Sequence, residues 1–533
     1  MKLLLRRISD RLLKQAMPLD AIFKTLTAII IIRTVIEKLL STGHKLLFDP
    51  VNFYSCIVGD LHMYFSWVCI FLSMSIPVAV FLDVRYRDAL KLTLVGFCMT
   101  VFVPLIDYAL TWGIGDEIRY FRSFDTFFYN YVNLFNPLAG MKGVTAGVRI
   151  EVATVFLGSF FFSWFGFGRG IVRSLLLAFS LYTIVYLYGY ILPFHHLVGI
   201  DLTTMAARST TSIDGTQALF FAYLVPFFLC LAGAAAILAL RERSGRIILS
   251  ILYPSRLLFY LLLLCFGLLF TAHQIGNYPK ILNTPDMLKL ISAALSISFL
   301  FIYAKLINDV NDLTIDRISN RKRPLVEGLM DKVDASRLSF VAAALSLVMA
   351  IPVGRDFFYF WFLMWGLSYV YSVPPFRFRR FWPLNNLILA TIGTAVFMAG
   401  ASIARPDDFY AALKNKEIIA YILLAFFFLC HLKDLKDIEG DRAGAVSNLF
   451  GHVSFPRVLV LAFFGAFLFL ILLIASLVDM LNAAVIIGTI ICAAISTGIV
   501  LRSRDLAGLD RLFVVSFIFL LYIAGVWLIC LSL

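Results

Sequence analysis

Long apolar segments recur along the whole chain and are separated by shorter polar segments that hold most of the Lys and Arg residues. Many approach the ~20 residues that an α-helix needs to cross a bilayer. The pattern therefore predicts an all-α polytopic membrane protein. Fifteen candidate spans lie near residues 20–40, 64–82, 90–110, 150–169, 174–192, 218–240, 258–274, 286–307, 336–353, 357–371, 384–402, 417–431, 457–478, 481–501 and 511–532.

Two of these segments are weaker than the others. The first contains Lys24, Arg33 and Glu37, so it could lie flat in the membrane interface instead of crossing. The segment at 357–371 is short and needs neighbouring residues to cross. Residues 111–149 and 193–217 are expected to form long outer loops.

The distribution of basic residues orients the chain and divides it. Across the last nine spans, one set of alternating loops carries sixteen Lys and Arg residues, and the opposite set carries five. The positive-inside rule places the richer set in the cytoplasm. A basic segment at 241–246 separates the first six spans from the last nine. We therefore expect a module of unknown role at residues 1–245, with about six spans, and a nine-span module at 246–533.

Composition agrees with a membrane protein and excludes several other classes. The chain is 61% hydrophobic and 15% charged, which is too little charge for a soluble protein of 533 residues. The net charge of +13 lies in the loops between spans, so we expect no nucleic-acid partner. None of the eight cysteines forms a C-x-x-C pair, so neither a disulfide framework nor a zinc site is indicated. No cleavable signal peptide is expected.

Three aspartates follow one apolar helix, in the segment NDVNDLTIDRISNRKRPL at 308–325. Asp309, Asp312 and Asp316 are spaced by three and then four residues, which places them within about 60° of one another on a helix. Three carboxylates on one face repel each other at the membrane edge. A hard divalent cation with oxygen ligands is the natural group to neutralise them.

A second segment, HLKDLKDIEGDRAG at 431–444, repeats this spacing with Asp434, Asp437 and Asp441. The charge pattern puts both motifs on the cytoplasmic side, so two acidic helix ends are expected to face each other across a cavity. A single motif of this kind could be a solvated acidic loop. Two motifs that match in spacing, side and depth favour a functional site.

Cations accompany both acidic motifs. Many of them serve to orient the helices, but Mg²⁺ together with Lys and Arg is also what a diphosphate requires. Between the motifs, the segment YSVPPFRFRR at 371–380 has a Pro-Pro pair that should end the preceding helix. Its Tyr371, Arg377 and Arg379 would reach the same face, although an ordinary turn with basic anchors fits equally well. The cations at the motifs are Arg317, Arg321, Lys322, Arg323, Lys433, Lys436 and Arg442.

Residues 246–533 resemble the UbiA superfamily of intramembrane prenyltransferases. The resemblance rests on N-D-x-x-D-x-x-x-D at 308–316 with Arg-Pro at 323–324, on K-D-x-x-D-x-E-G-D at 433–441, and on Y-S-x-P-P-x-R between them. The chain departs from the family where it has Ser447-Asn448-Leu449, Arg379 in place of a frequent Lys, and Tyr253-Pro254-Ser255-Arg256 in place of an Arg-Pro pair. Residues 1–245 resemble nothing that we recognise.

The resemblance implies a nine-helix ring around a cavity that is open to lipid, preceded here by the module of about six helices. It implies Mg²⁺, or Mn²⁺ in its place, and a prenyl diphosphate under a cytoplasmic cap. The metal ligands would be Asp309, Asp312, Asp316, Asp434, Asp437 and Asp441, with Asp312, Asp316, Asp437 and Asp441 as the catalytic acids. The substrate-binding residues would be Asn308, Arg323, Tyr371, Arg379 and Lys433, with Asn308 also serving the first metal.

The expected function is Mg²⁺-dependent transfer of a prenyl group from a prenyl diphosphate to a lipophilic acceptor, either a quinone precursor or a glycerol phosphate. Phosphoribosyl transfer to a polyprenyl phosphate, terpene cyclisation and non-enzymatic transport are the alternatives. The short spacing in DRISNRKRP favours prenyl transfer over phosphoribosyl transfer, and acids at helix ends disfavour a transporter. Asp107, inside an apolar span, is a further candidate, whereas His195 and His196 are read as a surface pair.

Overall fold

The computed structural model describes residues 2–14, 17–40, 53–111, 124–133, 135–136, 139–140, 144–189, 215–239, 254–274, 284–319, 323–404, 416–434, 449, 456–503 and 510–532. Every regular element within these ranges is a helix, and they contain no strand. The predicted all-α fold class is therefore confirmed.

The chain folds as two compact units. The described residues up to Ala239 belong to the first unit, and those from Pro254 onward belong to the second. The break falls beside residue 245, where the charge pattern placed it. The division into a module of separate role and a prenyltransferase domain stays a prediction.

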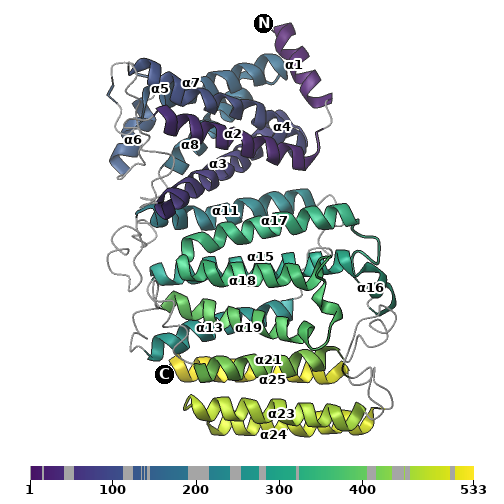
Figure 1. Cartoon of the computed structure of the whole chain (residues 1–533). Coiled ribbons are helices and arrows are strands. Elements are labelled where there is room, and N and C mark those ends of the chain that lie inside the picture. The colour runs from purple at the N-terminus through teal and green to yellow at the C-terminus, as the bar shows by residue number, and fades with distance from the viewer. Residues whose placement is uncertain are drawn as a thin grey trace. The chain divides into compact units, whose positions relative to one another are not determined.

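In the first unit, α3 packs against α4, α8 and α11, while α7 packs against α5 and α8 (Figure 1). Helix α6 lies within residues 111–149, which were predicted to form an outer loop. It was not predicted because its ten residues are too few to give the apolar signal of a membrane span. The elements are α1 (Lys2–Lys14), α2 (Leu19–Leu40), α3 (Phe53–Leu82), α4 (Tyr86–Phe97), η1 (Cys98–Phe102), α5 (Val103–Leu110), α6 (Phe124–Asn133), α7 (Ala146–Phe161), η2 (Phe162–Gly166), α8 (Ile171–Gly189) and α11 (Gly215–Ala239).

In the second unit, α13 packs against both α15 and α25, so the first and last long helices lie side by side. The elements are α13 (Pro254–Gln274), α15 (Thr284–Asn311), α16 (Leu313–Ser319), α17 (Lys332–Ala350), η3 (Ile351–Val353), α18 (Arg355–Ser372), η4 (Phe378–Arg380), α19 (Leu384–Ala404), α21 (Lys416–Asp434), α23 (Pro456–Leu477), α24 (Ala483–Arg502) and α25 (Asp510–Ser532).

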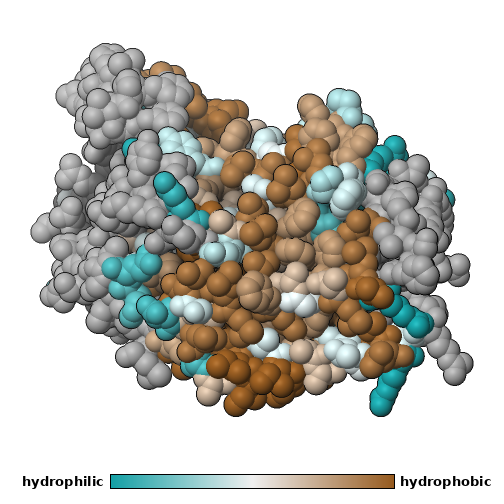
Figure 2. All heavy atoms as spheres, turned by 60° about the horizontal axis from the view of Figure 1, so that its bottom comes forward, coloured by the Kyte–Doolittle hydropathy of each residue, from teal (hydrophilic) through white to brown (hydrophobic). Residues whose placement is uncertain are grey.

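Each of the fifteen predicted spans coincides with a helix. Eleven helical stretches in the described ranges are long and apolar enough to cross a membrane, and α21 and α25 contain shorter apolar stretches. On α24, Ile487, Ile490 and Ile491 are all more than half exposed, as expected for side chains that face lipid. Figure 2 shows a face on which apolar side chains cover the middle and hydrophilic ones lie toward the margins. The protein is an integral, multi-pass membrane protein.

Two glycines let α13 and α19 cross at backbone contact. A Cβ at Gly267 would lie 2.0 Å from the Phe397 carbonyl oxygen, and one at Gly400 would lie 2.0 Å from the Leu264 carbonyl oxygen. Small residues allow such close packing between membrane helices, where no hydrophobic effect drives association. This crossing fixes two walls of the cavity described below.

Serines join α15 to α17 and α18. Ser346 on α17 donates to the Ser296 carbonyl at 2.7 Å, and Ser296 donates to the Ser346 carbonyl at 2.8 Å. The Trp361 indole of α18 donates to Ser346 Oγ at 2.6 Å. These buried polar contacts between helices hold α15, which carries the first acidic motif, in a fixed register.

Candidate active site

The first acidic motif forms the end of α15 and the start of α16. Asp312 lies between the two helices. Its N–H donates to the Asn308 carbonyl at 2.9 Å, and its carbonyl accepts from the Asp316 N–H at 2.9 Å. These two hydrogen bonds keep the chain helical. The predicted acidic face is therefore present. Asp309, Asp312 and Asp316 are only 3%, 2% and 1% exposed, so each carboxylate must be neutralised within the fold.

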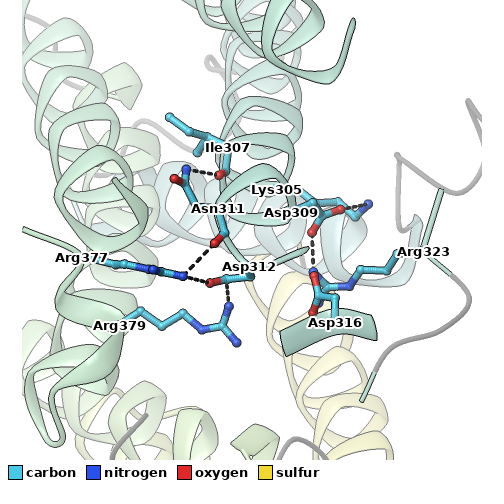
Figure 3. A network of polar contacts seen from close by, with 9 residues as sticks. All are labelled: Lys305, Ile307, Asp309, Asn311, Asp312, Asp316, Arg323, Arg377 and Arg379. Carbon is cyan, nitrogen blue, oxygen red and sulfur yellow. Dashed lines mark hydrogen bonds and ion pairs between the residues drawn. The ribbon is translucent and has the colours of Figure 1, made fainter. Parts of the chain in front are cut away.

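Arg323 neutralises two of the three acids (Figure 3). Its Nη1 lies 2.5 Å from Asp309 Oδ1 and 2.5 Å from Asp316 Oδ2. Lys305, one helical turn before Asp309, lies 3.1 Å from the other oxygen of that carboxylate. Two carboxylates from successive turns thus converge on one point, which a single nitrogen occupies.

The third acid is held from a different segment. Helix α18 ends at Ser372, as predicted from the Pro-Pro pair, and the chain turns through Arg377 in the left-handed conformation (φ 42°). This turn brings Arg377 Nη2 to 3.2 Å from Asp312 Oδ1, and the same nitrogen donates to the Asn311 carbonyl at 2.7 Å. Arg379 forms an ion pair with the second oxygen of Asp312.

The cations of the cluster outnumber its carboxylates by one. The three carboxylates face four cations, Lys305 and the three arginines described above, so the mutual repulsion expected from their spacing is offset. None of the four cations is more than a fifth exposed at its side chain. Pairs this far from water are screened little by salt and stay strong.

A cavity of about 230 Å³ lies against this cluster. Helices α13, α15, α18, α19 and α21 line it. Its polar end includes five of the predicted site residues, and the rest of its wall is mostly apolar, with Leu300, Phe301 and Val396 among the lining residues. The five are Asn308, Asp309, Arg323, Tyr371 and Arg379.

Two cations that line the cavity were not predicted as site residues. Lys305 precedes Asp309 by four residues, a spacing that could have identified it, because side chains four apart meet on a helix. Arg256 lines the cavity from α13, where the sequence departs from the family's Arg-Pro pair. Because of this departure, Arg256 was not predicted as a site residue.

The second acidic motif lies mostly outside the described residues. Helix α21 ends at Asp434, but the side chains of Lys433 and Asp434 are not described, and neither are Asp437 and Asp441. The predicted meeting of two acidic faces is therefore untested. Phe426, Leu429 and Cys430 of α21 line the cavity, so the helix that leads into the second motif is part of its wall.

A buried histidine ties α21 to the segment that carries the arginines. His431 is 1% exposed and its Nε2 accepts a hydrogen bond from the Trp382 indole at 2.9 Å. Its Nδ1 lies 2.7 Å from the Phe427 carbonyl, which can only accept, so Nδ1 carries the proton. This contact was not predicted from the sequence, because it joins α21 to a segment 49 residues away along the chain.

The oxygen donors at this site fit a divalent cation. In the described ranges no three His, Cys, Asp or Glu side chains gather around one point. Asp309 and Asp316 do converge on one position, now filled by the Arg323 nitrogen. Mg²⁺ is usually bound by one or two carboxylates, with the remaining ligands supplied by substrate phosphates and water. This donor set therefore suits Mg²⁺ that arrives with a diphosphate.

Asp107 in the first unit has a different environment. Its two oxygens accept hydrogen bonds from Thr145 Oγ1 at 2.6 Å and from the Gly147 N–H at 2.5 Å. Thr145 caps α7, so Asp107 fixes the start of that helix. This role is structural. His195 and His196 lie outside the described residues.

Comparison with known proteins identifies part of the chain. Residues 281–523 match the model of the UbiA prenyltransferase family. The digeranylgeranylglyceryl phosphate synthase of Methanocaldococcus jannaschii is 25% identical over 173 residues, which is 31% of this chain and 55% of that protein. The homologous synthase of Sulfolobus acidocaldarius is 31% identical, over 27% of this chain and 50% of its own length. The chain thus spans about half the length of these curated relatives.

Plant enzymes and a solved structure are also similar. Homogentisate solanesyltransferase of Arabidopsis thaliana is 28% identical over 31% of this chain and 43% of its own length. A UbiA homolog from Archaeoglobus fulgidus, solved with GPP and Mg²⁺, is 20% identical with a TM-score of 0.38, over 52% of this chain and 98% of that one. Residues 281–523 of the chain are thus similar to the UbiA prenyltransferase family.

Proposed function

We propose that residues 246–533 transfer a prenyl group from a prenyl diphosphate to a lipophilic acceptor within the membrane, with Mg²⁺ as cofactor. One observation carries this proposal: a buried acidic helix end and a set of cations border one cavity whose remaining wall is apolar. A prenyl diphosphate has the same division into a highly charged head and a hydrocarbon tail. The family match to residues 281–523 supports the same reaction class.

The cations at the cavity would bind the diphosphate. Arg256, Lys305, Arg323 and Arg379 all line the cavity, and Lys305, Arg323 and Arg379 form ion pairs with aspartates. A diphosphate that enters can accept hydrogen bonds from these side chains, because charge-assisted contacts to phosphate match those to carboxylate. As Arg323 turns toward phosphate, Asp309 and Asp316 become available to the metal. Mg²⁺, or Mn²⁺ in its place, would neutralise charge that develops on the departing diphosphate.

The acids of the second motif complete the proposed site. We assign Asp434, Asp437 and Asp441 to a second metal position and Lys433 to the diphosphate, because α21 already forms part of the cavity wall. Asp312 positions Arg377 and Arg379 and belongs to the same acidic face. Asn308 and Tyr371 line the cavity and are proposed to contact the diphosphate.

The apolar wall would protect the reacting carbon. Loss of diphosphate from an allylic substrate leaves a carbocation, which water would capture. Tyr260 and Phe301 line the cavity and exclude water, and their ring faces attract a cation. The acceptor then attacks the cation, and its proton passes to a carboxylate or to the released diphosphate.

The acceptor is proposed to be either a glycerol phosphate or a quinone precursor. The similar proteins include digeranylgeranylglyceryl phosphate synthases and a homogentisate solanesyltransferase, which support these two acceptor classes. We place the acidic motifs on the cytoplasmic side, because sixteen of the twenty-one loop cations in the last nine spans lie in that set of loops.

The proposal is tested with purified full-length protein, labelled allylic diphosphates and acceptors of both kinds. We expect Mg²⁺-dependent release of diphosphate and a prenylated acceptor that mass spectrometry detects. A cyclised hydrocarbon without acceptor, or transfer of phosphoribose to a polyprenyl phosphate, would replace prenyl transfer as the reaction. An absence of diphosphate release from every allylic substrate would contradict the proposal.

A further inference from the structure

A second cavity adjoins the first, and two phenylalanines belong to both. The second cavity has a volume of about 50 Å³ and is lined by α13, α21, α23 and α25. Phe259 and Phe426 line both cavities. Among the described residues, no charged side chain lines the second cavity, and the indole N–H of Trp527 is the only polar side-chain group that does.

The two cavities follow one another along α13 and along α21. On both helices, the first cavity is the one nearer to the charged end of the helix. On α13, the first cavity is lined by Arg256 and Phe259, and the second by Phe259, Leu263 and Phe266. The second cavity therefore lies one to two helical turns further from Arg256.

Helix α21 shows the same order from its own charged end. Leu429 and Cys430, which are closer along the helix to Asp434, line the first cavity. Ile422 and Ala425, which are further from it, line the second. Phe426 lies between them and lines both. Along both helices, the path from the charged groups into the apolar wall passes this pair of rings.

The two rings form a partition between the cavities. Their centroids lie 5.4 Å apart with planes inclined at 37°, and the residues are 6% and 7% exposed. Gly393 on α19 allows Phe426 to take this position. A Cβ at Gly393 would lie 2.4 Å from Phe426 Cε1 and 2.5 Å from Cδ1, so any larger residue must displace the ring.

We infer that the second cavity is the subsite for the distal isoprene units of a long prenyl chain, and that Phe259 and Phe426 limit the chain length that binds. This inference rests on the proposed function, because it takes the diphosphate to lie at the charged end of the first cavity. A hydrocarbon suits an uncharged wall. The polar part of an acceptor must instead reach the reacting carbon beside the diphosphate.

The two phenylalanine rings determine the free-energy cost of binding a longer prenyl chain. A short chain ends before the partition and does not touch it. A longer chain must move both rings from packed positions before it gains apolar contact in the second cavity. Each methylene that becomes buried changes affinity about fourfold, so removal of the obstruction should produce an effect that is easily measured.

The test measures how dimethylallyl, geranyl, farnesyl and geranylgeranyl diphosphates compete with labelled geranyl diphosphate for full-length protein in Mg²⁺. In Phe426→Ala and Phe259→Ala, we expect the affinity for the C20 chain relative to the C10 chain to rise on the order of tenfold. Affinity for the C5 diphosphate should stay within about twofold, since that substrate ends before the rings. Gly393→Ala should lower the relative C20 affinity, because its methyl group pushes Phe426 away from α19.

Phe357→Ala is the matched control, since Phe357 is 1% exposed on α18 and lines neither cavity. An unchanged C20-to-C10 ratio in both opening variants, with C5 binding intact, would overturn the inference. An equal rise in the Phe357 variant would also overturn it, since the effect would then be general loosening. Wild-type protein that binds no prenyl diphosphate would instead overturn the proposed function.

Discussion

Asp107 in the first unit and Asp312 in the second are both almost fully buried in helices of a membrane protein, yet different groups neutralise them. Asp107 accepts hydrogen bonds from a backbone N–H and from the hydroxyl of Thr145, both at the start of α7. Asp312 pairs with Arg377 and Arg379, and Arg379 lines a cavity. The sequence placed Asp107 inside an apolar span and Asp312 just after the end of one.

The difference lies in what the partner can do. Backbone donors at the start of α7 are fixed, so Asp107 contributes a constant interaction to the fold. Arginine side chains can rotate from a carboxylate to a phosphate, so the ion pairs around Asp312 can be exchanged for contacts with a substrate. We therefore expect changes at the two acids to separate stability from activity.

The largest effect should come from Asp312→Asn. The change removes the charge that holds two arginines, and transfer should fall by roughly 10³-fold or more if the acidic face supports departure of diphosphate. Transfer of labelled prenyl diphosphate, normalised to folded protein, measures this loss. Asp334→Asn is the matched control, because Asp334 is exposed on α17 and pairs only loosely with Arg337 at 3.6 Å. Transfer by Asp312→Asn within tenfold of wild type would remove Asp312 from the proposed site.

Arg323→Lys should have the next largest effect. Lysine keeps the charge and can place one nitrogen between Asp309 and Asp316, but as a single point donor it cannot bind phosphate through two parallel N–H groups as a guanidinium can. We expect affinity for the prenyl diphosphate to fall by roughly 10–100-fold, with a smaller change in the rate at saturation. Steady-state kinetics separates the two quantities. A fall in kcat alone would argue that Arg323 does not bind the ground-state diphosphate.

Asp107→Asn should change stability and leave the chemistry intact. Asparagine retains one carbonyl oxygen, so it can accept from Thr145 or from the Gly147 N–H but not from both. We expect a loss of about 1–3 kcal/mol in the stability of the first unit. Thermal melting reports the loss, and transfer per folded molecule should match wild type. Loss of transfer in protein that stays folded would show that the first unit takes part in the reaction.

Removal of the first unit should also leave most of the chemistry intact. A chain of residues 246–533 contains all the described residues that line the two cavities. We expect it to keep Mg²⁺-dependent transfer within about tenfold of the full chain, with lower stability in detergent because apolar surface can be exposed. Transfer and melting of both chains in the same detergent check this. Complete loss of transfer in a folded truncated chain would contradict the predicted domain division.

The sequence predicted the helices and the acidic face well, because both depend on local patterns. The length of an apolar segment predicts a membrane span, and the spacing of Asp309, Asp312 and Asp316 predicts that they share one face of a helix. The basic partners of these acids were harder to predict from the sequence. Arg377 and Arg379 reach Asp312 only through a turn after α18, and sequence spacing does not encode that distance in space.

Contacts set by tertiary packing were not predicted. The fit of the Phe426 ring against Gly393 depends on how α19 and α21 approach each other. The hydrogen bond between Trp382 and His431 likewise joins residues 49 positions apart. Helix α6 was missed because a short helix outside the spans has no strong apolar signal. These features require the arrangement of helices, which an apolar pattern does not specify.

The most direct test of the central claim is equilibrium binding of labelled geranyl diphosphate to the wild-type protein, with Mg²⁺ and with excess chelator. The account predicts saturable binding in Mg²⁺, a similar result in Mn²⁺, and a loss of at least about tenfold in affinity when the metal is removed. Equal binding with and without chelator would contradict the metal assignment. Absence of binding under both conditions would contradict the claim that this buried acidic helix end forms a prenyl diphosphate site.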